Sequence, residues 1–240
     1  MLIGLRPLIE AIQAGKDIEK VFVQKGLKGD LFLEARQVMQ EHGISYKTVP
    51  PEKLNGITNK NHQGVIAFIS PISFGNIENI VPSIYERGET PLILLLDSVT
   101  DVRNFGAIAR SAECFGAHAV LIPENNSAAI NEEAIKTSAG ALHNIAVCRI
   151  KSISALTEYL RQCGIALIGC TEKGNILPHA SKLKQPICIV MGNEETGISH
   201  ELMRKCDELV KIPMTGKTSS LNVSVASGII LYEAMRQRIV

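Results

Sequence analysis

Residues 187–222 read ICIVMGNEETGISHELMRKCDELVKIPMTGKTSSLN, and this stretch decides the fold of the C-terminal part of the chain. Two apolar runs, 187–191 and 209–212, each stop at polar sequence that contains glycine or proline. Such runs are typical of buried strands that deliver loops to one edge of a sheet. Because binding and chemistry usually occur on loops held by a rigid sheet, we expect the two loops to share one site.

The stretch is part of a longer alternating pattern that begins near residue 91. Strand-like runs such as LILLLD, HAVLIP and IALIGC alternate with helix-like segments such as NFGAIARSAECFG and SISALTEYLRQCG. Strands that are continuously apolar and separated by helices indicate a parallel sheet covered on both faces. A long final helix is predicted over residues 220–238, so this part is an α/β domain.

The first 70 residues predict a smaller α/β unit, with helical spacing of apolar residues in 5–12 and 31–42 and strand patterns in 18–24 and 64–70. Three prolines and two glycines then occur within residues 71–91, with little periodicity. We therefore expect an N-terminal domain at 1–72, a linker at 73–90 and a second domain at 91–240.

The amino-acid composition limits the classes of protein to which the chain can belong. The 240 residues are 45% hydrophobic and 20% charged, an ordinary globular balance, and the net charge of +1 neither indicates nor excludes a nucleic-acid partner. The longest apolar strings are too short to span a bilayer, so no membrane partner is expected. Six scattered cysteines without CxxC spacing argue against a metal site and predict free thiols in a reducing, cytoplasmic compartment. The N-terminus has no signal-peptide features.

The first loop with candidate chemistry is DSVTDVRNFGAIARSAECFGA, residues 97–117. Asn104 stands where a helix N-cap is expected, and Arg103 and Arg110 lie on either side of it. Two arginines near a helix N-terminus could bind phosphate. A capped helix with solvent-facing arginines explains the pattern equally well.

The second loop is GNEETG at 192–197, where two glycines flank two carboxylates directly after a strand. Glu194 and Glu195 would repel a pyrophosphate, and the loop is not GxGxxG, so NAD and ATP are poor candidate ligands. A cationic or hydroxyl-rich ligand suits carboxylates better. Taken alone, the loop is most simply a tight turn.

The third loop is IPMTGKTSSLNVSVA at 212–226, which brings Ser219, Ser220 and Asn222 to the start of the final helix. Capping explains one such residue but not the polar cluster over 217–222. GKTSS is not a P-loop, because the glycine required five positions before Gly216 is Lys211.

Together, NFGAIARSAECFGA, MGNEETGIS and IPMTGKTSSLNVSVASGIILYEAMRQ resemble the three motifs of the SpoU family. These are S-adenosylmethionine-dependent RNA ribose 2′-O-methyltransferases of the SPOUT, TrmH-like class. The first unit also resembles that family's L30e-like substrate-binding domain. The closing segment of this unit, NHQGVIAFIS, resembles the end of the same domain in the RlmB-type enzymes, which methylate a guanosine of 23S ribosomal RNA. The sequence departs from the family at Arg6 in GLRP, where relatives often have histidine.

The resemblance implies that residues 91–240 form a deep trefoil knot, which general folding rules disfavour. It also implies that S-adenosylmethionine binds in the knot, held by Gly192, Ile212, Met214 and Leu221. Apolar side chains and backbone amides of this kind suit an adenine.

The family's active-site positions correspond to Asn104, Arg110, Glu194, Ser220 and Asn222. A guanidinium stays protonated at neutral pH, so we interpret Arg110 as holding a phosphate and stabilising the developing 2′-alkoxide. Glu194 is expected to orient Asn104 or Arg110. Ser220 and Asn222 are expected to position the ribose or brace the loop.

The expected partners are RNA, with ribosomal RNA favoured over transfer RNA, and a second copy bound through the C-terminal domain. Candidate RNA contacts are Arg6, Lys60, Asn61, His62 and Arg103. Two alternatives remain: a transfer-RNA ribose methyltransferase, and a non-catalytic RNA-binding or ribosome-assembly protein with the same fold. A dehydrogenase is disfavoured because the dinucleotide glycines are missing.

Overall fold

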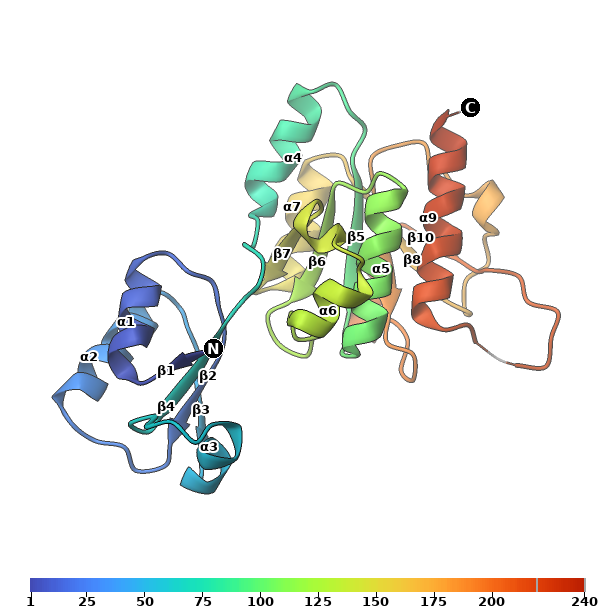
Figure 1. The fold of residues 1–240 in the computed structure, drawn as a ribbon. Helices are drawn as coiled ribbons and strands as arrows, with labels where there is room; N and C mark the ends of the chain where they lie inside the picture. The colour runs from blue at the N-terminus through green and yellow to red at the C-terminus, as the bar shows by residue number, and fades with distance from the viewer. Residues whose placement is uncertain (219, 240) are drawn as a thin grey trace. The chain divides into compact units, whose positions relative to one another are not determined.

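The computed structural model describes residues 1–218 and 220–239 (Figure 1). Ser219 of the third loop lies outside the described residues. The chain divides into two compact units, Met1–Ser73 and Phe74–Val240.

The first unit contains a four-stranded sheet in the order β1-β4-β2-β3, in which only β2 and β3 run parallel. Its strands are β1 (Leu2–Ile3), β2 (Ile18–Gln24), β3 (Lys47–Val49) and β4 (Val65–Ile69). Helices α1 (Leu5–Gln13) and α2 (Asp30–Glu41) pack on one face, and α3 (Pro51–Ile57) packs on the other. Alternation along β2 explains both cores, because Val21 and Val23 point towards α1 and α2, whereas Phe22 points towards α3.

The second unit is built on a six-stranded, fully parallel sheet in the order β10-β8-β9-β5-β6-β7. Its strands are β5 (Leu92–Asp97), β6 (Ala119–Pro123), β7 (Ala146–Ile150), β8 (Ala166–Cys170), β9 (Ile187–Gly192) and β10 (Glu208–Val210). Every residue of β5 and of β9 is buried, as their continuous apolar runs predict.

Helices cover both faces of this sheet (Figure 1). One face carries α4 (Ile77–Glu86), α7 (Ile153–Gln162) and the short α8 (His200–Met203), whose apolar side chains share one core with the strands. The other face carries α5 (Val102–Cys114), which packs against both α6 (Glu132–Thr137) and α9 (Val223–Ile239). Short 3₁₀ turns occur at Ala141–His143 and Pro178–Ala180.

The linker expected at 73–90 is instead largely helical. Asn76 caps α4 by accepting a hydrogen bond from the Glu78 amide at 2.9 Å, and Ile77, Val81 and Ile84 are buried. These apolar positions follow helical spacing, so the segment is periodic after all. Pro82 inside the helix is exposed, and it obscured this pattern in the sequence. The segment therefore belongs to the second unit.

All six strands of the second sheet point the same way, so their C-terminal ends share one edge. The chain passes from β5 to β6 and β7 on one side, then returns to place β8, β9 and β10 on the other side of β5. Ligands of open parallel sheets bind where the strand order reverses in this way. The loops after β5, β9 and β10 all reach this edge. Among the described residues, no helix is long and apolar enough to cross a membrane.

Candidate active site

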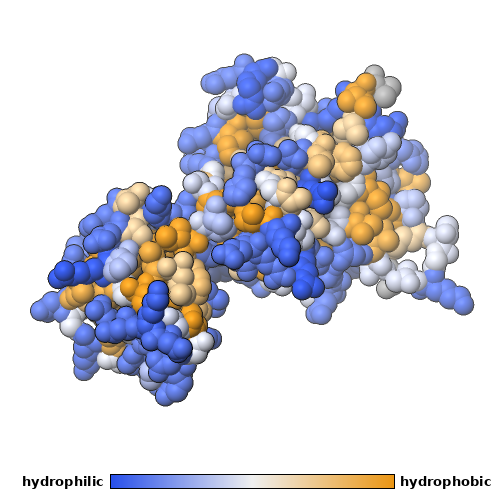
Figure 2. Space-filling view, in the orientation of Figure 1, coloured by the Kyte–Doolittle hydropathy of each residue, from blue (hydrophilic) through white to orange (hydrophobic). Residues whose placement is uncertain are grey.

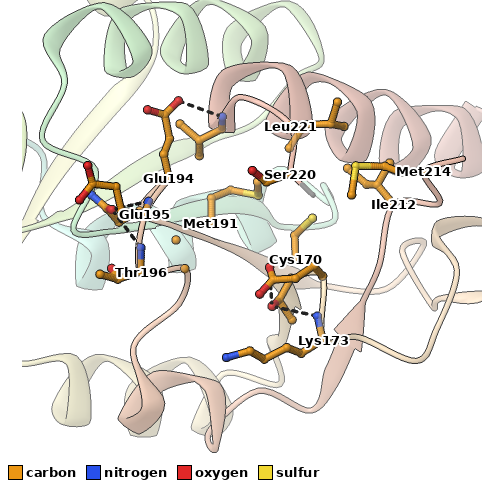
Figure 3. Close-up of a pocket in the computed structure, with 17 residues that line it drawn as sticks. Cys170, Lys173, Met191, Glu194, Glu195, Thr196, Ile212, Met214, Ser220 and Leu221 are labelled. Atoms are coloured by element: carbon orange, nitrogen blue, oxygen red, sulfur yellow. Dashed lines mark hydrogen bonds between the residues drawn. The ribbon is translucent and has the colours of Figure 1, made fainter. Parts of the chain in front are cut away.

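A pocket of about 390 Å³ opens at this edge of the sheet (Figure 3). The ends of β8 and β9, the loops that follow β9 and β10, and the start of α9 all contribute to its wall. The residues of the predicted site that line it are Gly192, Glu194, Ile212, Met214, Ser220 and Leu221. The two loops of residues 187–222 therefore do form one cavity.

Apolar side chains form one part of the pocket wall. Ile212 and Met214 come from the segment after β10, and Leu221 comes from the residues just before α9 (Figure 3). The volume lies within the range of roughly 300–1,000 Å³ that is usual for small-ligand sites. An apolar wall beside exposed backbone and carboxylates suits a ligand with both a flat aromatic part and a charged part.

Gly192 lets the chain turn sharply where β9 ends. A Cβ atom at this position would lie 2.1 Å from the Gly197 carbonyl carbon and 2.2 Å from the Ile198 nitrogen. Both neighbours are backbone atoms, so no side-chain rotation could relieve the clash. The close return of the loop therefore requires glycine.

Asn193 closes the GNEETG loop. Its side-chain oxygen accepts hydrogen bonds from the amides of Glu195 (2.8 Å) and Thr196 (3.3 Å), and its side-chain nitrogen donates to the Ser98 carbonyl (2.9 Å). The buried Asp97 accepts a hydrogen bond from the Ser199 amide at 2.6 Å. These contacts fasten the loop after β9 to the end of β5.

The most specific feature of the site is a polar cluster whose hydrogen bonds converge on one oxygen atom, Oε1 of Glu194. This atom accepts hydrogen bonds from the side-chain nitrogens of Asn104 (3.0 Å) and Asn222 (2.5 Å), and from the Val223 amide at 3.4 Å (Figure 3 shows the last). Asn222 also donates to the side-chain oxygen of Asn104 at 3.0 Å. Three motifs separated by up to 118 residues thus meet at one carboxylate.

Helix capping explains how two of these residues are placed. The N-cap of α5 is Asp101, whose carboxylate accepts from the amides of Arg103 and Asn104, so the expected cap at Asn104 is wrong. Asp101 satisfies the free amides, which leaves the Asn104 side chain available for Glu194. Asn222 caps α9, since its side-chain oxygen accepts from the Ser224 amide at 2.9 Å.

The two arginines of the first motif lie outside this cluster. Arg110 is exposed, forms no hydrogen bond or ion pair with a described residue, and points about 120° around the helix from Asn104. Arg103 is also exposed, and its Nε donates to the Glu133 carboxylate at 2.8 Å, which raises the pKa of the arginine. Neither arginine lines the pocket.

The N-terminal candidates lie near one another within the first unit. Arg6 and Lys60 are exposed, and the Gly4 amide donates to the Val65 carbonyl, which places the start of α1 beside the loop before β4. Both ring nitrogens of His62 form hydrogen bonds that hold that loop in place. Its Nδ1 accepts from the Gly64 amide (3.0 Å), so its Nε2 carries the proton and donates to Asn55 (2.9 Å).

Asn61 likewise uses its side-chain oxygen within the loop, accepting from the Gln63 amide at 3.2 Å. His62 and Asn61 therefore shape the loop, whereas the charged groups of Arg6 and Lys60 form no ion pair with a described residue.

The sequence interpretation missed the end of β8. Cys170, Thr171, Glu172 and Lys173 all line the pocket, and the same rule that singled out the ends of β5 and β9 applies to IALIGCTEK. Burial, with a smaller contribution from the nearby Glu172, raises the pKa of the Cys170 thiol to about 12. The thiol is therefore neutral at physiological pH and adds to the wall rather than to nucleophilic chemistry. The described residues contain no group of three or more metal-binding side chains.

Comparison with known families assigns both units. Residues 91–232 match the SpoU rRNA Methylase family, and residues 1–75 match the family described as RNA 2′-O ribose methyltransferase substrate binding.

Individual proteins show the same likeness along the whole chain. YacO of Bacillus subtilis, named as a TrmH family tRNA/rRNA methyltransferase, is 31% identical over 99% of this chain and 95% of its own length. An uncharacterized tRNA/rRNA methyltransferase of Synechocystis is 32% identical over 99% of this chain, which spans 62% of that protein.

Among solved structures, the SpoU methyltransferase AviRb of Streptomyces viridochromogenes, in complex with the cofactor AdoMet, matches with a TM-score of 0.64. That match has 27% identity and covers 99% of this chain and 90% of AviRb. The likeness confirms the expected SPOUT-type α/β architecture.

Proposed function

The chain belongs to the SpoU rRNA Methylase family, and from this membership we propose that it transfers the methyl group of S-adenosylmethionine to a ribose 2′-hydroxyl of structured RNA. The observation that carries the proposal is the carboxylate of Glu194, which gathers Asn104, Asn222 and the start of α9 at the wall of the pocket. A ligand pocket and a braced polar group side by side are what a group transfer between two bound molecules requires.

The described residues fit the methyl donor. Ile212, Met214 and Leu221 offer an apolar wall for an adenine, and Glu194 and Glu195 place negative charge on the same pocket. When bound, S-adenosylmethionine supplies a methyl group on a cationic sulfonium. Carboxylates near the pocket favour a cation, whereas they would repel a phosphate-bearing cofactor.

The protein must orient the ribose and help its hydroxyl lose a proton. Glu194 fixes the side-chain amides of Asn104 and Asn222, and we assign Ser220 to the ribose and Asn222 to bracing the loop. Oε1 receives all three donors of the cluster, and Oε2 accepts no hydrogen bond from a described residue, so we assign Oε2 to the substrate.

We place Arg110 on the RNA, where it holds a phosphate beside the target nucleotide and stabilises the developing 2′-alkoxide. Its exposed guanidinium, which has no ion-pair partner among the described residues, supports this role. Arg110→Lys keeps the charge but loses the planar fork, so the variant should bind S-adenosylmethionine normally and lose most transfer. Near-normal turnover by this variant would refute the role.

The substrate that we favour is a guanosine of 23S ribosomal RNA, because the N-terminal unit matches a substrate-binding family and NHQGVIAFIS is similar to the RlmB-type enzymes. We take residues 1–72 as the L30e-like RNA-binding domain, with Arg6 and Lys60 as its charged contacts. Arg103 on α5 of the second unit is a further proposed RNA contact. Six free cysteines support a reducing, cytoplasmic location.

We also propose a homodimer through the second unit. Val225, Ile229 and Tyr232 form an exposed apolar stripe along α9, and Leu221 extends the stripe to the pocket. An apolar helix face that begins at the pocket suits a second copy of the chain. This dimer would place the pocket next to the interface.

The proposal is tested with full-length protein, methyl-labelled S-adenosylmethionine, and unmodified transcripts of 23S ribosomal RNA and transfer RNA. We expect label in the ribosomal RNA and a 2′-O-methyl group on mapping of the modified nucleotide. Label in transfer RNA alone would favour the alternative substrate. Binding of S-adenosylmethionine without transfer to either RNA would favour the non-catalytic alternative and contradict the proposal.

A further inference from the structure

The first unit carries a concentrated positive charge on the side of its sheet that faces α3. Lys20 comes from β2, Lys47 from β3 and Lys53 from α3. Lys20 and Lys53 lie over the ring of Phe22, and Lys47 is the neighbour of Phe22 across the two strands. We call these three residues the lysine cluster. Hydrophilic side chains cover the surface around α3 in Figure 2.

Strand register places the members of the lysine cluster together. Lys47 pairs with Phe22 across β3 and β2, and Lys20 pairs with Phe68 across β2 and β4, so all four side chains lie on the same face. The Nζ atoms of Lys20 and Lys53 lie 5.1 Å and 5.4 Å from the centre of the Phe22 ring. The Phe22 and Phe68 rings meet edge to face at 6.3 Å.

Nothing among the described residues neutralises this charge. None of the three lysines forms an ion pair with a described carboxylate, and the ring of Phe22 compensates the ammonium groups only weakly. Three like charges gathered near one ring repel one another. An anion bound between them would remove that repulsion, so the free surface favours a negatively charged partner.

A fourth lysine joins this surface through the loop before β4. The hydrogen bond from His62 to Asn55 ties that loop to α3, the helix that carries Lys53. Lys60 of the same loop is exposed. The positive surface therefore extends from the sheet over α3 to this loop.

We propose that the lysine cluster, extended by Lys60, binds the phosphate backbone of the substrate RNA. Several separate cations drawn from three different elements match a ligand whose phosphates repeat along a chain, better than a single small anion does. The half-buried Phe68 beside Lys20 adds an aromatic edge where a base can rest. This inference rests on the proposed function and names the surface through which that function reaches its RNA.

The test compares two double variants of the full-length protein. Lys47→Gln/Lys53→Gln removes two charges from the lysine cluster, and Lys20 is kept so that Phe22 stays covered. Lys16→Gln/Arg36→Gln is the matched control, because both residues are exposed and belong to the segment after α1 and to α2, which pack on the opposite face. Affinity for an unmodified 23S ribosomal RNA transcript is measured across a salt titration, together with S-adenosylmethionine binding.

We expect the cluster variant to bind the RNA about tenfold or more weakly. The slope of log affinity against log salt concentration should fall by the amount that corresponds to about two lost phosphate contacts. Binding of S-adenosylmethionine should not change, and the control variant and Lys47→Arg/Lys53→Arg should bind RNA like the wild type. RNA affinity and salt dependence equal to the wild type in the cluster variant would overturn the inference.

If the double variant does not fold, the single variants Lys47→Gln and Lys53→Gln are tested in the same way, and each should lose less RNA affinity than the double variant. Failure of the proposed function is seen separately, because a wild-type protein that methylates no RNA would contradict that function whatever the two variants bind.

Discussion

Among single residues, Glu194 concentrates the hydrogen bonds that join the three motifs. Glu194→Gln preserves shape but removes the charge that strengthens the bonds from Asn104 and Asn222. We expect methyl transfer to fall by about 10- to 100-fold, with S-adenosylmethionine affinity changed much less. Single-turnover rates and calorimetric binding of the cofactor measure the two effects separately.

Glu195→Gln is the matched control, because Glu195 lines the same pocket but its carboxylate has no hydrogen-bond partner among the described residues. At saturating S-adenosylmethionine its single-turnover rate should stay near that of the wild type, because the charge of Glu195 acts on cofactor affinity rather than on the cluster. Equal losses in the two variants would show that overall negative charge, rather than the cluster, matters.

Arg238 acts on stability rather than on chemistry. Its guanidinium donates to the carbonyls of Leu183, Thr90, Pro91 and Gln185 at 2.8–3.0 Å, which ties the end of α9 to the segments that enter β5 and β9. Burial lowers the pKa of Arg238 to about 10, so the group remains charged at neutral pH.

Arg238→Met should therefore lower the free energy of unfolding of the second unit by about 2–4 kcal/mol, because four carbonyls lose a charged donor. Arg236→Met, two residues earlier, removes one ion pair between an exposed arginine and the partly buried Glu233, which keeps its hydrogen bond from Gln237, and should lower the free energy of unfolding by less. Thermal unfolding followed by circular dichroism compares them, and similar melting temperatures would contradict the prediction.

At the scale of elements, the turn from β9 into the GNEETG loop depends on backbone contact at Gly192. Gly192→Ala places a methyl group about where the Gly197 and Ile198 backbone lies, so the loop must move away. We expect a loss of stability of about 1–3 kcal/mol and a strong loss of S-adenosylmethionine binding. Gly216→Ala meets no atom within 4 Å and serves as the control, which should bind the cofactor normally.

Helix α4 shows where element prediction from sequence stops. Ile77, Val81 and Ile84 have helical spacing, but Pro82, Gly75 and Gly88 favour a loop interpretation of the same residues. Packing of the apolar side against the sheet stabilises the helix despite the proline. Intrinsic propensity is a weak guide wherever tertiary burial decides, and this helix is such a case.

For the whole molecule, the apolar stripe on α9 predicts self-association. Val225→Asp/Ile229→Asp puts two charges into the proposed interface and should convert a dimer into a monomer in sedimentation. Leu33→Asp, at an exposed leucine on α2 in the first unit, should leave the dimer intact. A wild-type protein that sediments as a monomer would contradict the proposed assembly.

Most strands and helices could be predicted from periodicity, because their apolar residues follow the spacing of the element that buries them. The continuous runs of β5 and β9 predicted a parallel sheet, and the charged and polar residues after them predicted an edge with a site. The resemblance of three motifs predicted the family, which the matching family model confirms.

The sequence by itself thus determined most of the elements, the parallel α/β class and the family. Only the tertiary structure decided that Asp101 caps α5, that Asn104 meets Glu194 and Asn222, and that Arg110 does not line the pocket. Element type depends on local spacing along the chain, which can be read from a sequence. Contacts between residues about 100 positions apart depend on strand order and on the rotation of helices against the sheet, which local spacing does not contain.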